Sequence, residues 1–581
     1  MGRRAVPLGS VTRQDIAPRQ YPKAHRGSRL SVCAEFLRSM RTALMFARIA
    51  AVALALPLAA CADNETAAPD ASGQLFARGL DEITDLYIEP VTNRKLSLAG
   101  AARLSRLDDK LAVTERDAGG LGPALILTYA GRELAAVPMP AEADTRGWGE
   151  AIAQLIAAAR AGAPNLAGMR RELASKAVFD GMTATLDRFS RYSPPDAARN
   201  QRAARDGFGG VGITLEMTAD GFKVAAVTPN GPAAQAGLRA GDTIVAIDGV
   251  AISGLSQSDV IQQLRGPVGS RLAIRVARPG VALARDFEVQ RALVVLPTVA
   301  MSRVGDIAIF QVLSFNQSTT EKLAEALAEA RRQTGGRLAG IVLDLRGNPG
   351  GLLDQAVSLA DLFIREGPIV STVGRHPASH QYFAASGHGV APQVPIALLI
   401  NGGSASSSEI VAAALQDAGR AVVIGSSSYG KGTVQTVLRL PNDGELMLTW
   451  ARLVTPSGYY LQTHGVVPTL CTSDLDDDAA SLQRGLQRAG AIAQGAPAAL
   501  RARRGLDERA WSELRQSCPA RQTSPAIDLK LAEHLLSDQR LYASALNALQ
   551  ASAPLARNPA PAGPPERVLT GVDRALSSRQ R

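Results

Sequence analysis

Residues 401–435 hold the side chains of this chain that are best suited to chemistry. Four serines there precede an apolar stretch with helical spacing: Ser404, Ser406, Ser407 and Ser408. A serine at a helix N-terminus lies in the partial positive field of the peptide dipoles. Lys431 follows the next strand-like segment and is flanked by glycines. Because a deprotonated lysine can act as the base for such a serine, the segment predicts Ser–Lys catalysis without histidine.

The same serines also have a purely structural interpretation. Ser406 and Glu409 fit the S-x-x-E capping box of a helix start. Spacing alone does not choose the nucleophile among the four serines. A free lysine has a pKa of ~10.4 and is protonated at neutral pH. Lys431 therefore also needs burial, which lowers the pKa of an amine.

The segment Gly425–Thr433 matches the phosphate-binding pattern G-x-x-x-x-G-K. Position 432 is glycine, however, where a magnesium ion needs a serine or threonine hydroxyl. Residues 433–440 alternate as a strand, whereas a phosphate loop opens a helix. We therefore expect no nucleotide site.

The histidines offer no alternative active site. His376 and His380 are four residues apart in a polar loop, without a predicted helix or a nearby carboxylate to complete a metal site. We expect no metal and no cofactor.

Residues 343–351 run from a buried apolar strand into a Gly/Pro turn. Gly350 and Gly351 allow the backbone to approach a substrate closely and to point amides at it. An ordinary strand-to-helix turn would explain these residues equally well. We expect Asp344 and Arg346 to form a structural ion pair.

Residues 207–213 open a region of short strands and Gly/Pro turns that extends to about residue 292. Consecutive backbone N–H groups of such a loop can bind a carboxylate, and the strand that follows can accept an extended peptide at its edge. The predicted peptide-binding residues are Phe208, Gly209, Gly210, Val211, Gly212 and Ile213.

The positive charge belongs to the start of the chain. Of the net charge of +10, residues 1–61 carry +8, from ten basic and two acidic side chains. We therefore expect no nucleic-acid partner. The apolar run 49–60 ends at Cys61 and is typical of a secretory signal, too short to span a bilayer. Its end resembles a bacterial lipobox, which predicts lipid attachment at Cys61 and a periplasmic, membrane-anchored lipoprotein; a plain signal peptide is the alternative.

Two further cysteines, Cys471 and Cys518, would remain in the mature chain. An even pair in an oxidising compartment suggests a disulfide, and two isolated buried thiols are the alternative.

The elements that must position these residues fall into six regions. They are a leader (1–61), a helical region (62–205), a small β domain (206–292), an α/β core (293–470), a helical region (471–550) and a disordered tail (551–581). In the second region the patterns predict helices over 75–87, 96–111, 148–160 and 173–186, and a hairpin over 124–137.

Several motifs occur together in a fixed order. Residues 207–292, with PAAQAGLRAGD at 232–242, resemble a PDZ domain. Residues of about 75–105 and 173–470 resemble the carboxyl-terminal processing, or tail-specific, proteases. The matching segments are LDLRGNPGG at 343–351, GSASSSE at 403–409, YGKGTVQ at 429–435 and LVTPSGYYLQ at 453–462.

This resemblance implies a role for each site residue. Ser406 is the nucleophile, Lys431 the general base and Gln435 its helper, and the oxyanion hole consists of the amides of Ser407 and of Gly350 or Gly351. It also implies a crotonase-like and Clp-protease-like layered α/β core with an inserted PDZ domain and helical flanks. The expected partners are proteins and peptides with free C-termini, a second copy of the chain and an adaptor protein.

Two other functions are compatible with parts of the sequence. A non-catalytic PDZ scaffold or chaperone would retain the fold without turnover, but the complete Ser406, Lys431 and Gln435 set argues against it. A Ser–Lys amidase or esterase for small molecules would have no use for a PDZ domain.

Overall fold

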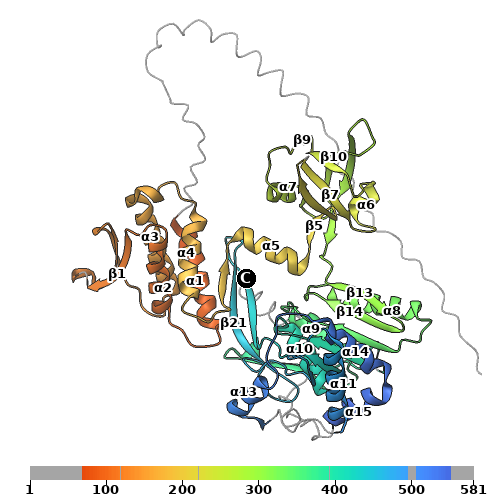
Figure 1. The fold of residues 1–581 in the computed structure, drawn as a ribbon. Helices are drawn as coiled ribbons and strands as arrows, with labels where there is room; N and C mark the ends of the chain where they lie inside the picture. The colour runs from red at the N-terminus through yellow and green to blue at the C-terminus, as the bar shows by residue number, and fades with distance from the viewer. Residues whose placement is uncertain (1–68, 118, 220, 392, 495–504, 551–581) are drawn as a thin grey trace, which may run out of the picture. The chain divides into compact units, whose positions relative to one another are not determined.

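The computed structural model describes residues 69–117, 119–219, 221–391, 393–494 and 505–550 (Figure 1). The predicted leader with Cys61 and the predicted disordered tail lie outside these ranges. Within them, no helix combines the length and apolar character needed to cross a membrane.

The first described region packs four helices against a small antiparallel sheet. Its elements are α1 (Pro69–Leu86), α2 (Asn93–Ala102), β1 (Leu111–Asp117), β2 (Pro123–Tyr129), β3 (Arg132–Pro138), α3 (Thr145–Gly162) and α4 (Arg171–Thr183). The predicted hairpin is confirmed: Ala130 and Gly131 both have positive φ, as a tight two-residue turn requires.

The predicted helix over 96–111 is wrong beyond Ala102. A 3-10 turn covers Arg103–Arg106, and Leu111 already pairs with Tyr129 in the sheet. Asp108 explains the break, because its side chain accepts the backbone N–H of Lys110 at 3.0 Å and so favours a turn over a further helical turn.

The small β region forms a sheet of order β11-β10-β8-β7-β6, with β6 at an edge. Strand β10 alternates buried and exposed residues along its whole length, as a strand with one face on a core does. Its elements are β5 (Phe208–Gly210), β6 (Ile213–Thr218), β7 (Gly221–Val227), α6 (Pro232–Ala236), β8 (Thr243–Ile247), β9 (Val250–Ala251), α7 (Gln257–Leu264), β10 (Arg271–Ala277), β11 (Arg285–Gln290) and β12 (Ala292–Val294).

The α/β core is built on a sheet of order β13-β14-β15-β18-β19-β22, parallel except for the pair β13 and β14. Both faces are buried, which explains the continuous apolar runs of its central strands. Its elements are β13 (Val299–Val304), β14 (Ile307–Val312), α8 (Thr319–Gln333), β15 (Gly340–Asp344), α9 (Leu353–Asp361), β18 (Ile396–Ile400), α10 (Ser407–Asp417), β19 (Val422–Gly425) and β22 (Leu470–Cys471).

Successive side chains of β14 enter two different cores. Phe310 packs in the core that contains residues of α8, α9 and α10, whereas Ile309 packs with residues of the C-terminal helices. The helices of this second core are α11 (Ala479–Gln494), α14 (Ala526–Ser537) and α15 (Gln539–Gln550), whereas Trp511 and Leu514 of α13 (Glu508–Gln516) belong to the core of Phe310. The predicted layered α/β core with helical flanks is confirmed.

A second sheet has the order β17-β16-β21-β20. Its strand β20 begins at the end of the loop that carries Lys431, here called the lysine loop. Strand β4 pairs with β21, and leucines of β20 and β21 share a core with helices α1–α4. The elements are β4 (Arg191–Ser193), α5 (Pro195–Asp206), β16 (Pro368–Val373), β17 (Gln381–Ala384), β20 (Thr433–Arg439) and β21 (Glu445–Val454). This sheet brings the segment before β4 to the lysine.

Candidate active site

The structure distinguishes the four serines by what their hydroxyls do. Ser404, Ser407 and Ser408 are buried, and each donates its hydroxyl to a backbone carbonyl: Leu345 at 2.8 Å, Gly351 at 3.0 Å and Asn348 at 2.9 Å, respectively. Ser406 alone among the four is half-buried. The other three hydroxyls hold the turn together, which leaves Ser406 as the serine accessible to a substrate.

Ser406 lies immediately before α10 and has a φ of 56°, a backbone conformation that residues other than glycine rarely adopt. A positive φ at a residue other than glycine costs free energy and needs support from its surroundings. The support here is a hydrogen bond from the Ser406 backbone N–H to Glu409 Oε2 at 2.7 Å.

Glu409 is fully buried and links the serine to the lysine. Its Oε2 also accepts the backbone N–H of Lys431 at 2.9 Å, and its Oε1 accepts Ser428 Oγ at 2.5 Å and the Gly430 N–H at 2.6 Å. Burial raises the pKa of this carboxyl and the four donors oppose the increase. The capping glutamate therefore fixes both backbones that carry the candidate catalytic side chains.

The amine of Lys431 lies against apolar surface. Its Nζ is 5.2 Å from the centre of the Phe189 ring. Burial lowers the pKa of Lys431, and the charge of Arg191 lowers it further, whereas Glu409 and Asp187 oppose the change. A lysine base needs a change in this direction.

Gln435 lies on β20. Its Nε2 donates to Thr433 Oγ1 at 2.9 Å and to Thr449 Oγ1 at 3.2 Å. Among the described residues no hydrogen bond joins Lys431 Nζ to Ser406 or to Gln435. Because the two threonines hold the amide nitrogen, the Gln435 oxygen is the atom free to accept from the lysine amine.

The glycine turn lies directly against the serine. A Cβ on Gly350 would come within 2.9 Å of Ser406 Cβ and 3.0 Å of the Ser407 nitrogen, so no larger residue fits there. The Gly350 N–H donates to Asn348 Oδ1 at 2.8 Å. Within the described residues, neither the Ser407 N–H nor the Gly351 N–H donates to another protein atom. This favours Gly351 over Gly350 as the partner of Ser407 in an oxyanion hole.

The predicted peptide-binding loop divides into two parts. Phe208, Gly209 and Gly210 form β5 and pair with β12 in a two-stranded sheet, and their role in peptide binding stays a prediction. Val211 and Gly212 lie outside the strands, and in the described chain neither amide donates a hydrogen bond. Ile213 begins β6, the edge strand that is open to an added peptide.

Other predicted features have structural roles. Arg346 pairs with Asp344 at 2.8 Å and with Asp528 of α14 at 3.3 Å, which confirms the expected ion pair. Residue 433 begins a strand and not a helix, which argues against a phosphate-binding loop. Within the described ranges no three His, Cys, Asp or Glu side chains gather as metal ligands. Cys471 and Cys518 form a disulfide.

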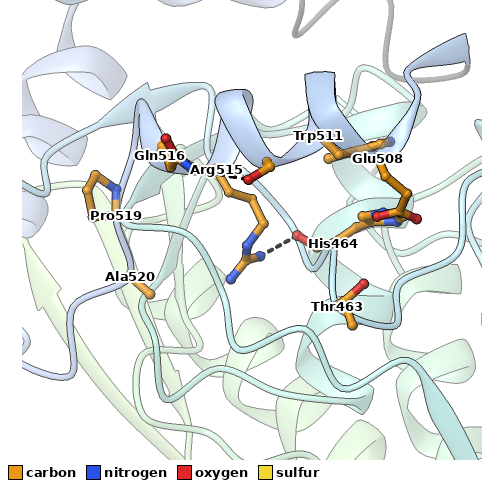
Figure 2. Close-up of a pocket in the computed structure, with 9 residues that line it drawn as sticks. Thr463, His464, Glu508, Trp511, Arg515, Gln516, Pro519 and Ala520 are labelled. Atoms are coloured by element: carbon orange, nitrogen blue, oxygen red, sulfur yellow. Dashed lines mark hydrogen bonds and ion pairs between the residues drawn. The ribbon is translucent and has the colours of Figure 1, made fainter.

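Two cavities share the segment Thr463–His464, whose Thr463 N–H donates to the Gly430 carbonyl next to Lys431. One of about 430 Å³ is lined by Asp187, Phe189, Thr433 and Thr449 among others. It therefore reaches both the aromatic ring next to the Lys431 amine and the two threonines that bind Gln435. The other, of about 500 Å³, lies between the loop at Thr463 and His464 and helix α13 (Figure 2). Sequence reasoning missed Phe189, Asp187 and Arg191, because nothing local marks them as neighbours of residue 431.

Known proteins resemble both parts of this arrangement. The sequence model of Peptidase family S41 matches residues 306–471, and that of the PDZ domain matches residues 223–278. Together these matches define a serine-type peptidase with a PDZ domain.

Relatives identify the family. The carboxy-terminal-processing protease of Bartonella bacilliformis is 41% identical over 294 residues, which are 50% of this chain and 68% of that protein. The carboxy-terminal processing protease CtpB of Bacillus subtilis is 33% identical, over 53% of this chain and 64% of that protein. The chain belongs to the carboxy-terminal processing proteases. The solved photosystem II D1 C-terminal processing protease is 30% identical over 52% of this chain and 82% of its own, with a TM-score of 0.32.

Proposed function

We propose that this protein is an endopeptidase in which Ser406 is the nucleophile and Lys431 the general base. The observation that carries the proposal is the shared carboxylate: the backbones of both residues are bound to one oxygen of Glu409. The lowered pKa of Lys431 supports it, because more of the amine is neutral at a given pH.

The proposed reaction uses these residues as follows. The Lys431 amine takes the proton from Ser406 Oγ, which attacks the carbonyl carbon of the substrate. The resulting oxyanion accepts hydrogen bonds from the N–H groups of Ser407 and Gly351. The C–N bond then breaks as Lys431 returns the proton to the leaving amine, and water releases the acyl group by the reverse sequence. Gln435 is proposed to orient the amine by accepting from it with Oε1, a hydrogen bond that the described structure does not contain.

Substrate selection is assigned to the PDZ domain. An extended C-terminal segment would add to the edge strand β6, and its carboxylate would bind the amides of Val211 and Gly212. The open edge and the two amides without a protein acceptor support this proposal. The substrates would then be proteins with a free, unstructured C-terminus.

The proposed location is the periplasmic side of a bacterial envelope, with a lipid anchor on Cys61. Its support is the lipobox-like ending of the apolar run before that cysteine. Cells given a radiolabelled fatty acid should label the wild-type protein and leave Cys61→Ala unlabelled. Equal labelling of the two would contradict the anchor.

The catalytic proposal is tested with three variants and an unstructured protein substrate. Ser406→Ala and Lys431→Met should abolish cleavage while the proteins stay folded. Ser427→Ala is the matched control, since its buried hydroxyl in the same loop has no hydrogen-bond partner in the described structure. Wild-type cleavage by Ser406→Ala would reject the mechanism; loss of turnover in every form, wild type included, would favour the scaffold function.

A further inference from the structure

Residues 508–524, here called the C-terminal brace, follow the part of the chain that matches the S41 family, which ends at residue 471. The brace comprises α13 and the segment after it. It contacts both loops that carry the candidate catalytic residues, although nothing in its sequence resembles a catalytic motif.

Arg515 makes the contact with the lysine loop. Its Nη2 donates to the Ser428 carbonyl at 3.0 Å and its Nη1 donates to the His464 carbonyl. Figure 2 shows the side chain extending from α13 to the His464 backbone. Burial lowers the pKa of Arg515, yet a guanidinium keeps its charge in proteins. The planar, charged guanidinium of Arg515 thus binds two carbonyls that belong to separate loops.

Ser428 contacts both Arg515 and the shared carboxylate of Glu409: its carbonyl accepts from Arg515, and its side chain donates to Glu409. The hydroxyl of Ser428 donates to Glu409 Oε1, and Gly430, two residues on, donates its N–H to the same oxygen. Gly465 lies between these groups: a Cβ there would come within 2.7 Å of Arg515 Nη1 and 3.1 Å of Glu409 Oε1. Arg515 therefore fixes the loop whose donors hold Glu409.

The brace is itself anchored on both sides of Arg515. Trp511 is buried and stacks on His464 with the ring centres 4.8 Å apart. Cys518 is held by its disulfide to Cys471. Further on, the Arg521 carbonyl accepts the Gly402 N–H at 2.6 Å, and its N–H donates to Ser426 Oγ at 2.9 Å. The brace thus contacts both the loop that carries Ser406 and the loop that carries Lys431.

We propose that Arg515 is a positioning residue for catalysis, which holds the 426–431 loop in the conformation that lets Glu409 bind the amides of Ser406 and Lys431. This inference rests on the proposed function of these two residues. It predicts an effect on turnover and not on substrate binding, because Arg515 lies behind the loop and not on the PDZ edge.

The test measures kcat and KM separately for Arg515→Met, together with the rate at which a fluorophosphonate modifies Ser406. We expect kcat and the modification rate to fall together by about 10- to 100-fold, as for a small displacement of catalytic groups. KM should stay within about twofold and the thermal midpoint near that of wild type, since Trp511 and the disulfide still anchor α13. Arg515→Lys should restore part of the loss, because an ammonium keeps the charge without the fork.

Arg509→Met is the matched control on the same helix, where an exposed arginine pairs with Glu513 at 3.0 Å and with no other acidic side chain of the described residues. It should behave as wild type. Wild-type kcat in Arg515→Met would overturn the inference, while an inactive Ser406→Ala in the same assay would leave the proposed function intact. If Arg515→Met does not fold, Arg515→Lys decides: an unchanged kcat overturns the inference and a reduced kcat at unchanged KM supports it.

Discussion

The backbone amides of Ser406 and Lys431 donate to the same carboxylate oxygen, Glu409 Oε2, at 2.7 and 2.9 Å. This common hydrogen-bond acceptor fixes the two loops relative to each other, although Ser406 and Lys431 are 25 positions apart in the sequence. The side chains themselves are not hydrogen-bonded to each other, so the carboxylate defines the site before substrate arrives.

The pH dependence of cleavage should follow the lysine amine. Because the neutral form is the active base, kcat/KM should rise with pH and level off above the pKa of Lys431, which lies below its ordinary 10.5. Arg191→Gln removes a positive neighbour, so the rise should move to higher pH. Asp187→Asn removes a negative neighbour, so the rise should move to lower pH.

Both variants are measured by initial rates across the pH range with one peptide substrate. Asp187→Asn keeps the side-chain oxygen that accepts the N–H of Ser190 at 2.7 Å, so it changes charge with little change of shape. Shifts of both variants in the same direction would contradict the assignment of the base.

Glu409→Gln should impair both turnover and stability. An amide offers one acceptor oxygen where the carboxylate offers two, so two of the four donors lose their partner. We expect kcat to fall about 100-fold and the free energy of unfolding to fall by about 1–3 kcal/mol. Glu366→Gln, a change at an exposed side chain, is the control for denaturant unfolding and kinetics. Full activity of Glu409→Gln would show that the shared acceptor is dispensable.

Recognition of the substrate terminus should depend on its charge. The inactive variant Ser406→Ala should bind a peptide with a free C-terminal carboxylate at least about tenfold more tightly than the same peptide amidated, since an amide loses charge-assisted hydrogen bonds. Fluorescence anisotropy with the full chain measures both affinities. Equal affinities would assign recognition to some other part of the substrate.

The disulfide should stabilise the attachment of the brace. It closes a loop with a sequence separation of 47, so replacing both Cys471 and Cys518 by alanine should lower the free energy of unfolding by about 2–5 kcal/mol. Denaturant unfolding of the two proteins measures the difference. An unchanged midpoint would mean that the pair contributes nothing to the folded state in solution.

Much of the fold is predictable because its signals are local. The hairpin predicted over 124–137 is present as β2 and β3, and a helix begins after Ser406, where the sequence fits a capping box. The second sheet was missed: β21 is buried along nearly its whole length and so lacks alternation. One of its partners, β4, is about 250 residues away, and no local pattern reports such a pairing.

The candidate site divides in the same way. Ser406, Glu409 and Lys431 occur in short motifs with fixed spacing, so sequence could propose them. Spacing alone did not choose Ser406 among the four serines; the family resemblance did, and the hydrogen bonds of the other three agree with that choice. Phe189 and Arg515 could not be predicted, because each reaches the lysine loop from a distant segment through tertiary packing.

The most direct test of the account is a titration of the Lys431 amine in the folded protein. With ¹³C-labelled lysine, NMR can follow the Cε resonance that disappears in Lys431→Met. If Lys431 is the base, its pKa is lower than that of exposed lysines and equal to the pKa that governs modification of Ser406. A Lys431 that titrates with the exposed lysines, while Ser406 reacts fully at neutral pH, would contradict it.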